Sequence, residues 1–160
     1  MKKHLRHIAA LIALILALGI AAVSLSGCKE DENVLHDGYF TAVQSGYEHG
    51  WQEYLTIDVK NGKIVTAEFQ AITPSGFVKS WDLNYMRTMN ATDGTYPNEY
   101  VRILTQEFLE KQDSEVDAVT GATNSSTRFL KLAALVIEQA KAGDANVAVL
   151  EEEGGEEAHG

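Results

Sequence analysis

The chain has 160 residues, of which 45% are hydrophobic, and it contains a single cysteine and five histidines. One cysteine excludes an intramolecular disulfide, a CxxC redox pair, a CxxCH haem attachment and a cysteine-ligated cluster, and the scattered histidines argue against a zinc centre. The net charge is −10, and the first 27 residues contain basic residues but no acidic ones. Because an acidic surface repels phosphate backbones, we exclude nucleic acid as a partner.

The first 27 residues are predicted to be a signal peptide of the lipoprotein type. Basic residues precede the apolar run of residues 8–23, which is short for a membrane-spanning helix of about 20 residues. The segment ends in Leu25-Ser26-Gly27-Cys28. This resembles the lipobox of bacterial lipoproteins, in which the peptide is cut before the cysteine and the thiol is acylated. The resemblance implies that acyl chains on Cys28 anchor the protein to the cell membrane, on its extracytoplasmic face. A free cysteine behind an uncleaved signal anchor is the alternative.

Composition divides the rest of the chain into three parts. Residues 28–37 are polar and acidic, which predicts a short tether after the lipidated Cys28. Residues 145–160 are rich in glutamate and glycine, which predicts a disordered tail. Residues 38–144 lie between them, contain no internal repeat, and are predicted to form a single folded domain.

The first half of this domain is predicted to form strands. Residues 38–43 and 51–71 are rich in aromatic and β-branched side chains. Helical spacing of apolar residues then predicts three helices. They are residues 80–90 with Ser80 as N-cap, residues 98–112 capped by Asn98, and residues 125–142 with Gly143 as the stop. The expected fold class is α+β, a curved antiparallel sheet with helices packed on one side.

A hairpin is predicted around Asn61-Gly62, and two registers are possible. A two-residue turn would set the apolar side chains of the first strand on the same face as polar residues of the second. A three-residue loop ending at a left-handed Gly62 pairs Val59 with Lys63, and it joins those apolar side chains to the face that holds Phe69. The second register gives one nearly clean apolar face, so we predict the three-residue, bulged hairpin.

The segment of residues 117–126, DAVTGATNSS, is where chemistry is expected. It links two predicted helices and opens onto the N-terminus of the last one. Such an end presents unpaired backbone N–H groups and about half a positive charge, which suit a phosphate. Gly121 and Ala122 leave room for a bulky ligand or another macromolecule to approach the backbone. Thr123 then offers a hydroxyl where a phosphate is favoured.

This segment resembles the flavinylation motif of the FMN-binding domain family, Asp-x-x-(Ser/Thr)-Gly-Ala-(Thr/Ser). The matching residues are Asp117, Thr120, Gly121, Ala122 and Thr123, and Thr120 replaces the commoner serine. The resemblance covers nearly all of residues 38–143, including DGYF at 37–40, WDLNYM at 81–86 and DGTYPN at 93–98. It implies that these five residues bind the cofactor, and that a flavin transferase moves FMN from FAD onto the hydroxyl of Thr123 as a phosphoester.

The resemblance implies an electron carrier rather than an enzyme with its own substrate. Electrons would come from a membrane-bound donor, such as a quinone-linked dehydrogenase, and pass to acceptors outside the cytoplasm. A chain without cysteine pairs or metal ligands needs an organic cofactor for redox work, and a covalent cofactor is not lost from an exposed surface. Two alternatives stay open: a non-redox surface lipoprotein, adhesive or ligand-binding, that keeps the fold without flavin, and a non-covalent FMN binder.

Several aromatic and thioether side chains are candidates for contact with the flavin ring, since both kinds stack well on flat π-systems. The candidates are Trp81, Tyr85, Met86, Met89 and Tyr96. From these we select Trp81, Met86 and Tyr96 as possible ring contacts. A stripe at helical spacing is also typical of a core-facing side, and for Trp81 and Met89 the core is the favoured interpretation.

Overall fold

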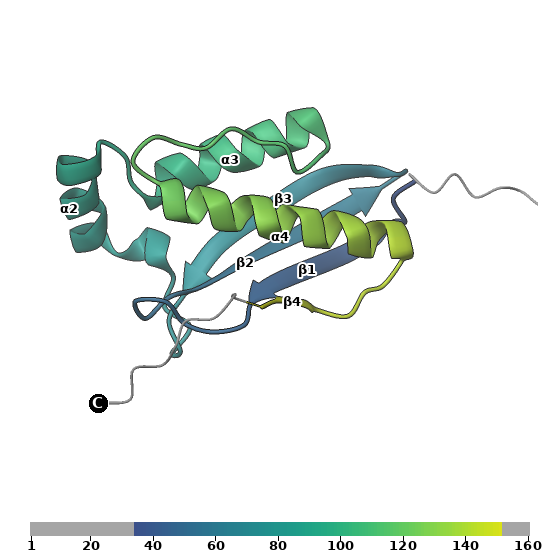
Figure 1. The fold of residues 1–160 in the computed structure, drawn as a ribbon, viewed down its shortest axis with the longest axis horizontal. Helices are drawn as coiled ribbons and strands as arrows, with labels where there is room; N and C mark the ends of the chain where they lie inside the picture. Colours follow the sequence, from purple (N-terminus) through teal and green to yellow (C-terminus); the bar gives the residue numbers. More distant parts are fainter. Residues whose placement is uncertain (1–33, 152–160) are drawn as a thin grey trace, which may run out of the picture. The chain divides into compact units, whose positions relative to one another are not determined.

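The computed structural model describes residues 34–151 of the chain. They form a four-stranded mixed sheet with helices, which confirms the predicted α+β class (Figure 1). The predicted signal peptide, the lipidation site Cys28 and the last part of the predicted tail lie outside the described residues.

The sheet has the strand order β3-β2-β1-β4. Its first three strands pair antiparallel, as predicted, whereas the fourth pairs parallel with β1 and makes the sheet mixed. The strands are β1 (Gly38–Gln44), β2 (Gln52–Lys60), β3 (Lys63–Ile72) and β4 (Ala148–Leu150).

Both segments that flank the predicted domain contribute to it. The prediction of a disordered tail was wrong for β4. Ala148 and Leu150 pack against the hydrophobic core, and the strand that contains them extends the sheet beyond β1. The prediction of a tether was wrong for its last residues. Leu35 is buried, and the N–H of His36 donates to the carbonyl of Ala140 at 2.8 Å. Apolar contacts therefore extend the folded domain past both predicted boundaries.

Two long helices, α3 (Pro97–Lys111) and α4 (Thr123–Ala142), lie over one face of the sheet (Figure 1). This confirms the prediction of helices packed on one side. Two shorter elements, the 3₁₀ helix η1 (Lys79–Trp81) and α2 (Leu83–Asp93), follow β3 at one end of the sheet. No helix within residues 34–151 is long and apolar enough to cross a bilayer.

The first predicted helix begins later than expected. Ser80 lies in η1, and its hydroxyl donates to Gln70 Oε1 at 3.0 Å instead of capping a helix. The cap of α2 is Asp82, whose Oδ1 accepts from the N–H of Tyr85 at 3.0 Å. An aspartate accepts such a bond as well as a serine does, so composition did not distinguish the two.

The other two predicted helices begin earlier than expected. Tyr96 rather than Asn98 precedes α3, because the fixed φ of Pro97 suits the first helical position. The last helix begins at Thr123 with Ala122 as its N-cap, two residues before the predicted start at Ser125. This shift moves Thr123 from the loop into the first position of α4.

The β2–β3 hairpin has the predicted apolar face at Phe69, but its turn differs, and Val65, which the predicted register put on that face, is exposed while Ile64 is buried instead. Leu55 lies opposite Phe69 and both are buried, which confirms the shared apolar face. The three-residue loop was wrong: the turn holds only Asn61 and Gly62, at φ angles of 53° and 69°. Two successive left-handed residues are what a type I′ hairpin turn requires, and Gly62 is left-handed as predicted.

The prediction put one extra residue in the loop, whereas in the structure the extra residue is Val65, within β3. Val59 pairs with Ile64 rather than with Lys63, and the next pair joins Asp58 to Thr66, so Val65 has no partner. Val65 is 47% exposed, whereas Ile64 is only 3% exposed. The bulge therefore puts Ile64 rather than Val65 on the apolar face, and from Thr66 onward it restores the alternation that a longer loop would have given.

Replacing Gly62 by valine is expected to lower the free energy of unfolding by about 1 kcal/mol or more, because β-branched residues tolerate positive φ poorly. The N–H of Gly62 also donates to Asp37 Oδ1 at 3.0 Å, so a displaced turn would loosen the start of β1. Thermal unfolding measures the effect. Asn61→Gly, which keeps both turn positions permissive, is the control and should change the melting temperature less. Equal melting temperatures for Gly62→Val and the parent would contradict the left-handed turn.

The core between the sheet and the two long helices fixes the direction of α4. Phe129 makes edge-to-face contacts with Phe69 of β3 and Phe108 of α3, at centroid distances of 5.0 and 5.6 Å. All three rings are at most 1% exposed. Such pairs add specific geometry to the burial of apolar surface. The N-terminus of α4 is thereby held at the end of the sheet where η1 and α2 lie.

Candidate functional site

A cavity of about 710 Å³ lies at the N-terminal end of α4. This volume falls within the range of about 300–1,000 Å³ that is typical of small-molecule sites. The β1–β2 connection with the start of β2, the η1–α2 region, and the loop before α4 with its first turns form the walls. The lining residues are Glu48, His49, Trp51, Glu53, Lys79, Tyr85, Met89, Asp93, Gly121, Ala122, Thr123, Asn124, Ser125 and Arg128.

The structure brings three of the five predicted cofactor-binding residues to this cavity, namely Gly121, Ala122 and Thr123. Asp117 and Thr120 are not among the lining residues, and both are exposed in the loop before α4. The motif therefore divides into a part that lines the cavity and an exposed part outside its lining.

Thr123 combines exposure with a position at a helix N-terminus. It is the first residue of α4, and its N-cap, Ala122, has no side chain that can accept a hydrogen bond from the first turn. The N–H groups of that turn therefore keep their partial positive charge for another acceptor. Within residues 34–151 the hydroxyl of Thr123 makes no hydrogen bond, so its oxygen is available as a nucleophile.

The packing of the chain itself requires glycine at position 121. It has a φ of 82°, and a Cβ built at this position would lie only 2.2 Å from the carbonyl oxygen of Asp93 at the end of α2. The sequence interpretation, that the small side chain admits a ligand or a macromolecule, is corrected here: the nearest occupant of that space is the backbone of Asp93. The loop before α4 and the end of α2 thus meet closely, and both line the cavity.

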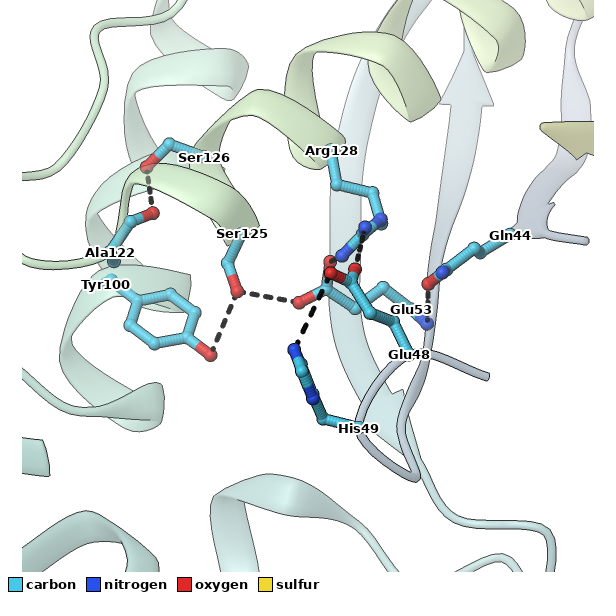
Figure 2. Close-up of polar contacts among 9 residues, drawn as sticks. All are labelled: Gln44, Glu48, His49, Glu53, Tyr100, Ala122, Ser125, Ser126 and Arg128. Atoms are coloured by element: carbon cyan, nitrogen blue, oxygen red, sulfur yellow. Dashed lines mark hydrogen bonds and ion pairs between the residues drawn. The ribbon is translucent and has the colours of Figure 1, made fainter. Parts of the chain in front are cut away.

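An ion-pair cluster around the buried Glu53 forms the sheet side of the cavity (Figure 2). Glu53 is 3% exposed; one carboxylate oxygen accepts from the Ser125 hydroxyl at 2.7 Å and the other from Arg128 Nη1 at 3.0 Å. Arg128 also pairs with Glu48 in the β1–β2 connection. Behind the cluster, burial raises the pKa of Tyr100, whose hydroxyl lies 3.5 Å from the Ser125 oxygen. The two carboxylates pair with Arg128 and tie α4 to β2 and to the β1–β2 connection.

The η1–α2 side and the start of β2 supply apolar and aromatic surface. The rings of Trp51 and Tyr85 have centroids 6.4 Å apart, and the thioether of Met89 lines the same cavity. The ammonium of Lys79 lies 4.9 Å from the centroid of Tyr85 and 5.8 Å from that of Trp51.

The residues selected from the sequence as ring contacts lie elsewhere. Trp81, Met86 and Tyr96 are not among the lining residues, and Trp81 is 66% exposed rather than part of the core. Two other candidates, Tyr85 and Met89, do line the cavity. They are four residues apart in α2 and share one face of it, whereas Trp81 precedes that helix.

Trp51 and Glu53 were missed by the sequence analysis, although one signal for Glu53 was present. The inward positions of β2 are Glu53, Leu55, Ile57 and Val59, so a carboxylate interrupts an otherwise apolar series. A buried carboxylate requires partners, and such an interruption therefore indicates a polar cluster.

The fold belongs to a known class of domain. The model of the FMN-binding domain family matches residues 46–138, and the chain belongs to that family. The resemblance seen in the sequence is thereby confirmed, and FMN is the cofactor for which the family is named.

Two relatives match most of the chain. The 15 kDa lipoprotein of Treponema pallidum (strain Nichols) is 34% identical over 124 residues, which cover 77% of this chain and 87% of the relative. The crystal structure of a Clostridium perfringens protein is 34% identical, with a TM-score of 0.72, and the match covers 74% of this chain and 99% of that one.

The residues that line the cavity fit FMN. Trp51, Tyr85 and Met89 offer the flat and polarisable surface that an isoalloxazine ring packs against. The first turn of α4 offers backbone N–H groups for a phosphate, beside the hydroxyl of Thr123. An apolar wall with a few convergent polar groups is the usual composition of a cofactor site.

Proposed function

We propose that this protein is a membrane-anchored flavoprotein that carries FMN covalently on Thr123 and relays electrons between membrane donors and extracytoplasmic acceptors. The observation that carries the proposal is the exposed Thr123, which lines the cavity at the start of α4 and whose hydroxyl makes no hydrogen bond to any described residue. A hydroxyl in this position can be reached by a modifying enzyme and, once esterified, keeps its phosphate beside the helix N-terminus.

The attachment is a phosphoryl transfer that leaves the redox state of the flavin unchanged. The oxygen of Thr123 bonds to the phosphorus that carries the FMN moiety of FAD, the bond to the AMP half breaks, and the hydroxyl proton goes to solvent or to a base of the transferase. Exposed Asp117 and Thr120 are available for recognition by that transferase, and neither lines the cavity.

Bound FMN supplies one- and two-electron chemistry, and the chain supplies a site for it. Trp51 and Tyr85 would pack against the ring and exclude water from it, while the Glu53–Arg128 ion pair holds α4 against β2. The covalent bond prevents loss of the cofactor to the surroundings. We take the electron donor to be a membrane-bound, quinone-linked dehydrogenase and the chain to be a carrier without a substrate of its own.

Attachment to the membrane is proposed through Cys28, which lies outside the described residues. The lipobox-like Leu25-Ser26-Gly27-Cys28 supports it, as does the 34% identity to a protein named as a lipoprotein. Two or more acyl chains on that cysteine would give a stable hold on the bilayer.

Replacing Cys28 by alanine is expected to release the protein from the membrane fraction, because the chain contains no other thiol to acylate. Membrane and soluble fractions of cells expressing the variant are compared with the parent by immunoblot. Lys29→Ala, the neighbouring change, keeps the cysteine and should fractionate as the parent does. Undiminished membrane association of Cys28→Ala would contradict lipidation and favour an uncleaved anchor.

The function as a whole is tested by intact-mass analysis of the full-length protein, co-expressed with a flavin transferase and extracted from membranes. We expect the combined mass of the acyl chains and one FMN, together with reversible bleaching of the flavin by a chemical reductant. Flavin that dissociates on denaturation would make the protein a non-covalent binder. A protein without flavin despite active transferase would be a surface lipoprotein that has kept only the fold.

A further inference from the structure

We propose that Lys79 is the residue that raises the reduction potential of the flavin. Its ammonium is held inside the cavity by Trp51 and Tyr85, where it stabilises the negative charge that the isoalloxazine ring gains on reduction. This inference rests on the proposed function, because it requires FMN in the cavity.

The backbone fixes the position of Lys79 from both sides. Ile72 at the end of β3 forms an isolated bridge with Val78, so the chain folds back on the strand immediately before η1. On the other side, the hydroxyl of Ser80 donates to Gln70 Oε1 in β3 at 3.0 Å. Lys79 therefore starts from an anchored stretch of backbone, and its ammonium lies beside the two neighbouring aromatic rings, 4.9 Å from the centroid of Tyr85 and 5.8 Å from that of Trp51.

Lys79 and Arg128 both line the cavity, but their charges have different partners. Arg128 is paired with both Glu48 and Glu53. Among the described residues, no carboxylate forms an ion pair with Lys79, and aromatic faces hold its ammonium instead. An aromatic face attracts a cation without neutralising it, so the positive charge remains available to an anionic group in the cavity.

The electron balance shows which state this charge favours. The oxidised ring is neutral; when it accepts two electrons from a reduced donor and one proton from solvent, it carries one negative charge. A fixed ammonium in a partly water-excluded cavity attracts that charge and leaves the neutral oxidised ring almost unaffected. The reduced state is selectively stabilised, so the midpoint potential is raised.

The test is a spectroelectrochemical titration of the full-length, flavinylated protein and three variants. Lys79→Met removes the charge but keeps an unbranched side chain, and Lys79→Arg keeps the charge. Lys63→Met makes the same charge change at the exposed start of β3, at the opposite end of this ten-residue strand from η1. We expect Lys79→Met to weaken stabilisation of the reduced ring at least tenfold, which lowers a two-electron midpoint potential by about 30 mV.

The controls decide the interpretation. Lys79→Arg and Lys63→Met should each shift the potential by less than a third of that amount, with intact mass and melting temperature measured for every variant. A Lys79→Met protein that carries flavin and has the parent's potential overturns the inference and leaves the proposed function intact. An equal shift in Lys63→Met also overturns it, because net charge would then explain the effect. A parent protein without flavin would contradict the proposed function itself, and with it this inference.

Discussion

Thr123→Ala is expected to abolish covalent flavin attachment. In cells that express an active flavin transferase, the variant should lack the mass of one FMN, and its band on a denaturing gel should lose flavin fluorescence. The reason is chemical: without the hydroxyl, no oxygen at this position can form the phosphoester. Thr123→Ser keeps the nucleophile and should retain at least part of the labelling.

The structure identifies the control for this experiment and predicts the effect on stability. Thr127 is exposed one helical turn after Thr123, so Thr127→Ala should remain labelled. Ser125 is a poor control, because it is buried and its hydroxyl donates to Glu53. The N-cap of α4 is Ala122, and the Thr123 hydroxyl makes no bond within residues 34–151, so Thr123→Ala should change the free energy of unfolding by no more than about 0.5 kcal/mol.

One result would contradict the assignment of the attachment site to Thr123, and a second would remove the support that loss of labelling gives to it. Full labelling of Thr123→Ala would move the attachment site to another hydroxyl and leave the carrier function in place. Loss of labelling from Thr127→Ala as well as from Thr123→Ala would indicate that the transferase recognises the whole first part of α4, so that loss of label no longer identifies the esterified oxygen.

The parts of the fold that depend on local periodicity could be predicted from the sequence. Phe129, Leu132 and Val136 recur at helical spacing and are all fully buried in α4. The faces of the hairpin followed from alternation, since only one choice of faces puts Leu55 and Phe69 together. The same argument could not distinguish a loop residue from a bulge at Val65, because both restore the same alternation.

The site required contacts that no local pattern encodes. The motif put Thr123 close to the start of the last helix, although the predicted start at Ser125 was two residues late. Trp51 immediately precedes β2, and Tyr85 of α2 is brought beside it at the same cavity. The strand β4 could not be predicted either, because three residues in an acidic tail are too few to be recognised as a strand. It forms through long-range pairing with β1.

Gly121→Ala is expected to destabilise the protein and to impair flavin attachment. Alanine at a φ of 82° is strained, and its Cβ would lie 2.2 Å from the carbonyl oxygen of Asp93, a backbone atom that cannot rotate away. Strain of this kind costs about 1–3 kcal/mol and overpacking about as much again. We therefore expect a loss of about 3 kcal/mol in the free energy of unfolding, measured by denaturant titration of the protein without flavin.

The matched control is Gly76→Ala, because it separates the backbone strain from the collision. Gly76 has a φ of 80°, but a Cβ at this position would have nothing within 4 Å. This variant should therefore lose only the strain contribution, about 1 kcal/mol, and should remain labelled by the transferase. In Gly121→Ala the loop before α4 must move away from Asp93, which displaces the cavity wall beside Thr123, so labelling should fall even in the fraction that stays folded. Equal losses of stability in the two variants, with equal labelling, would mean that the loop accommodates the methyl group without cost. The close approach of Gly121 to α2 would then not be what positions Thr123.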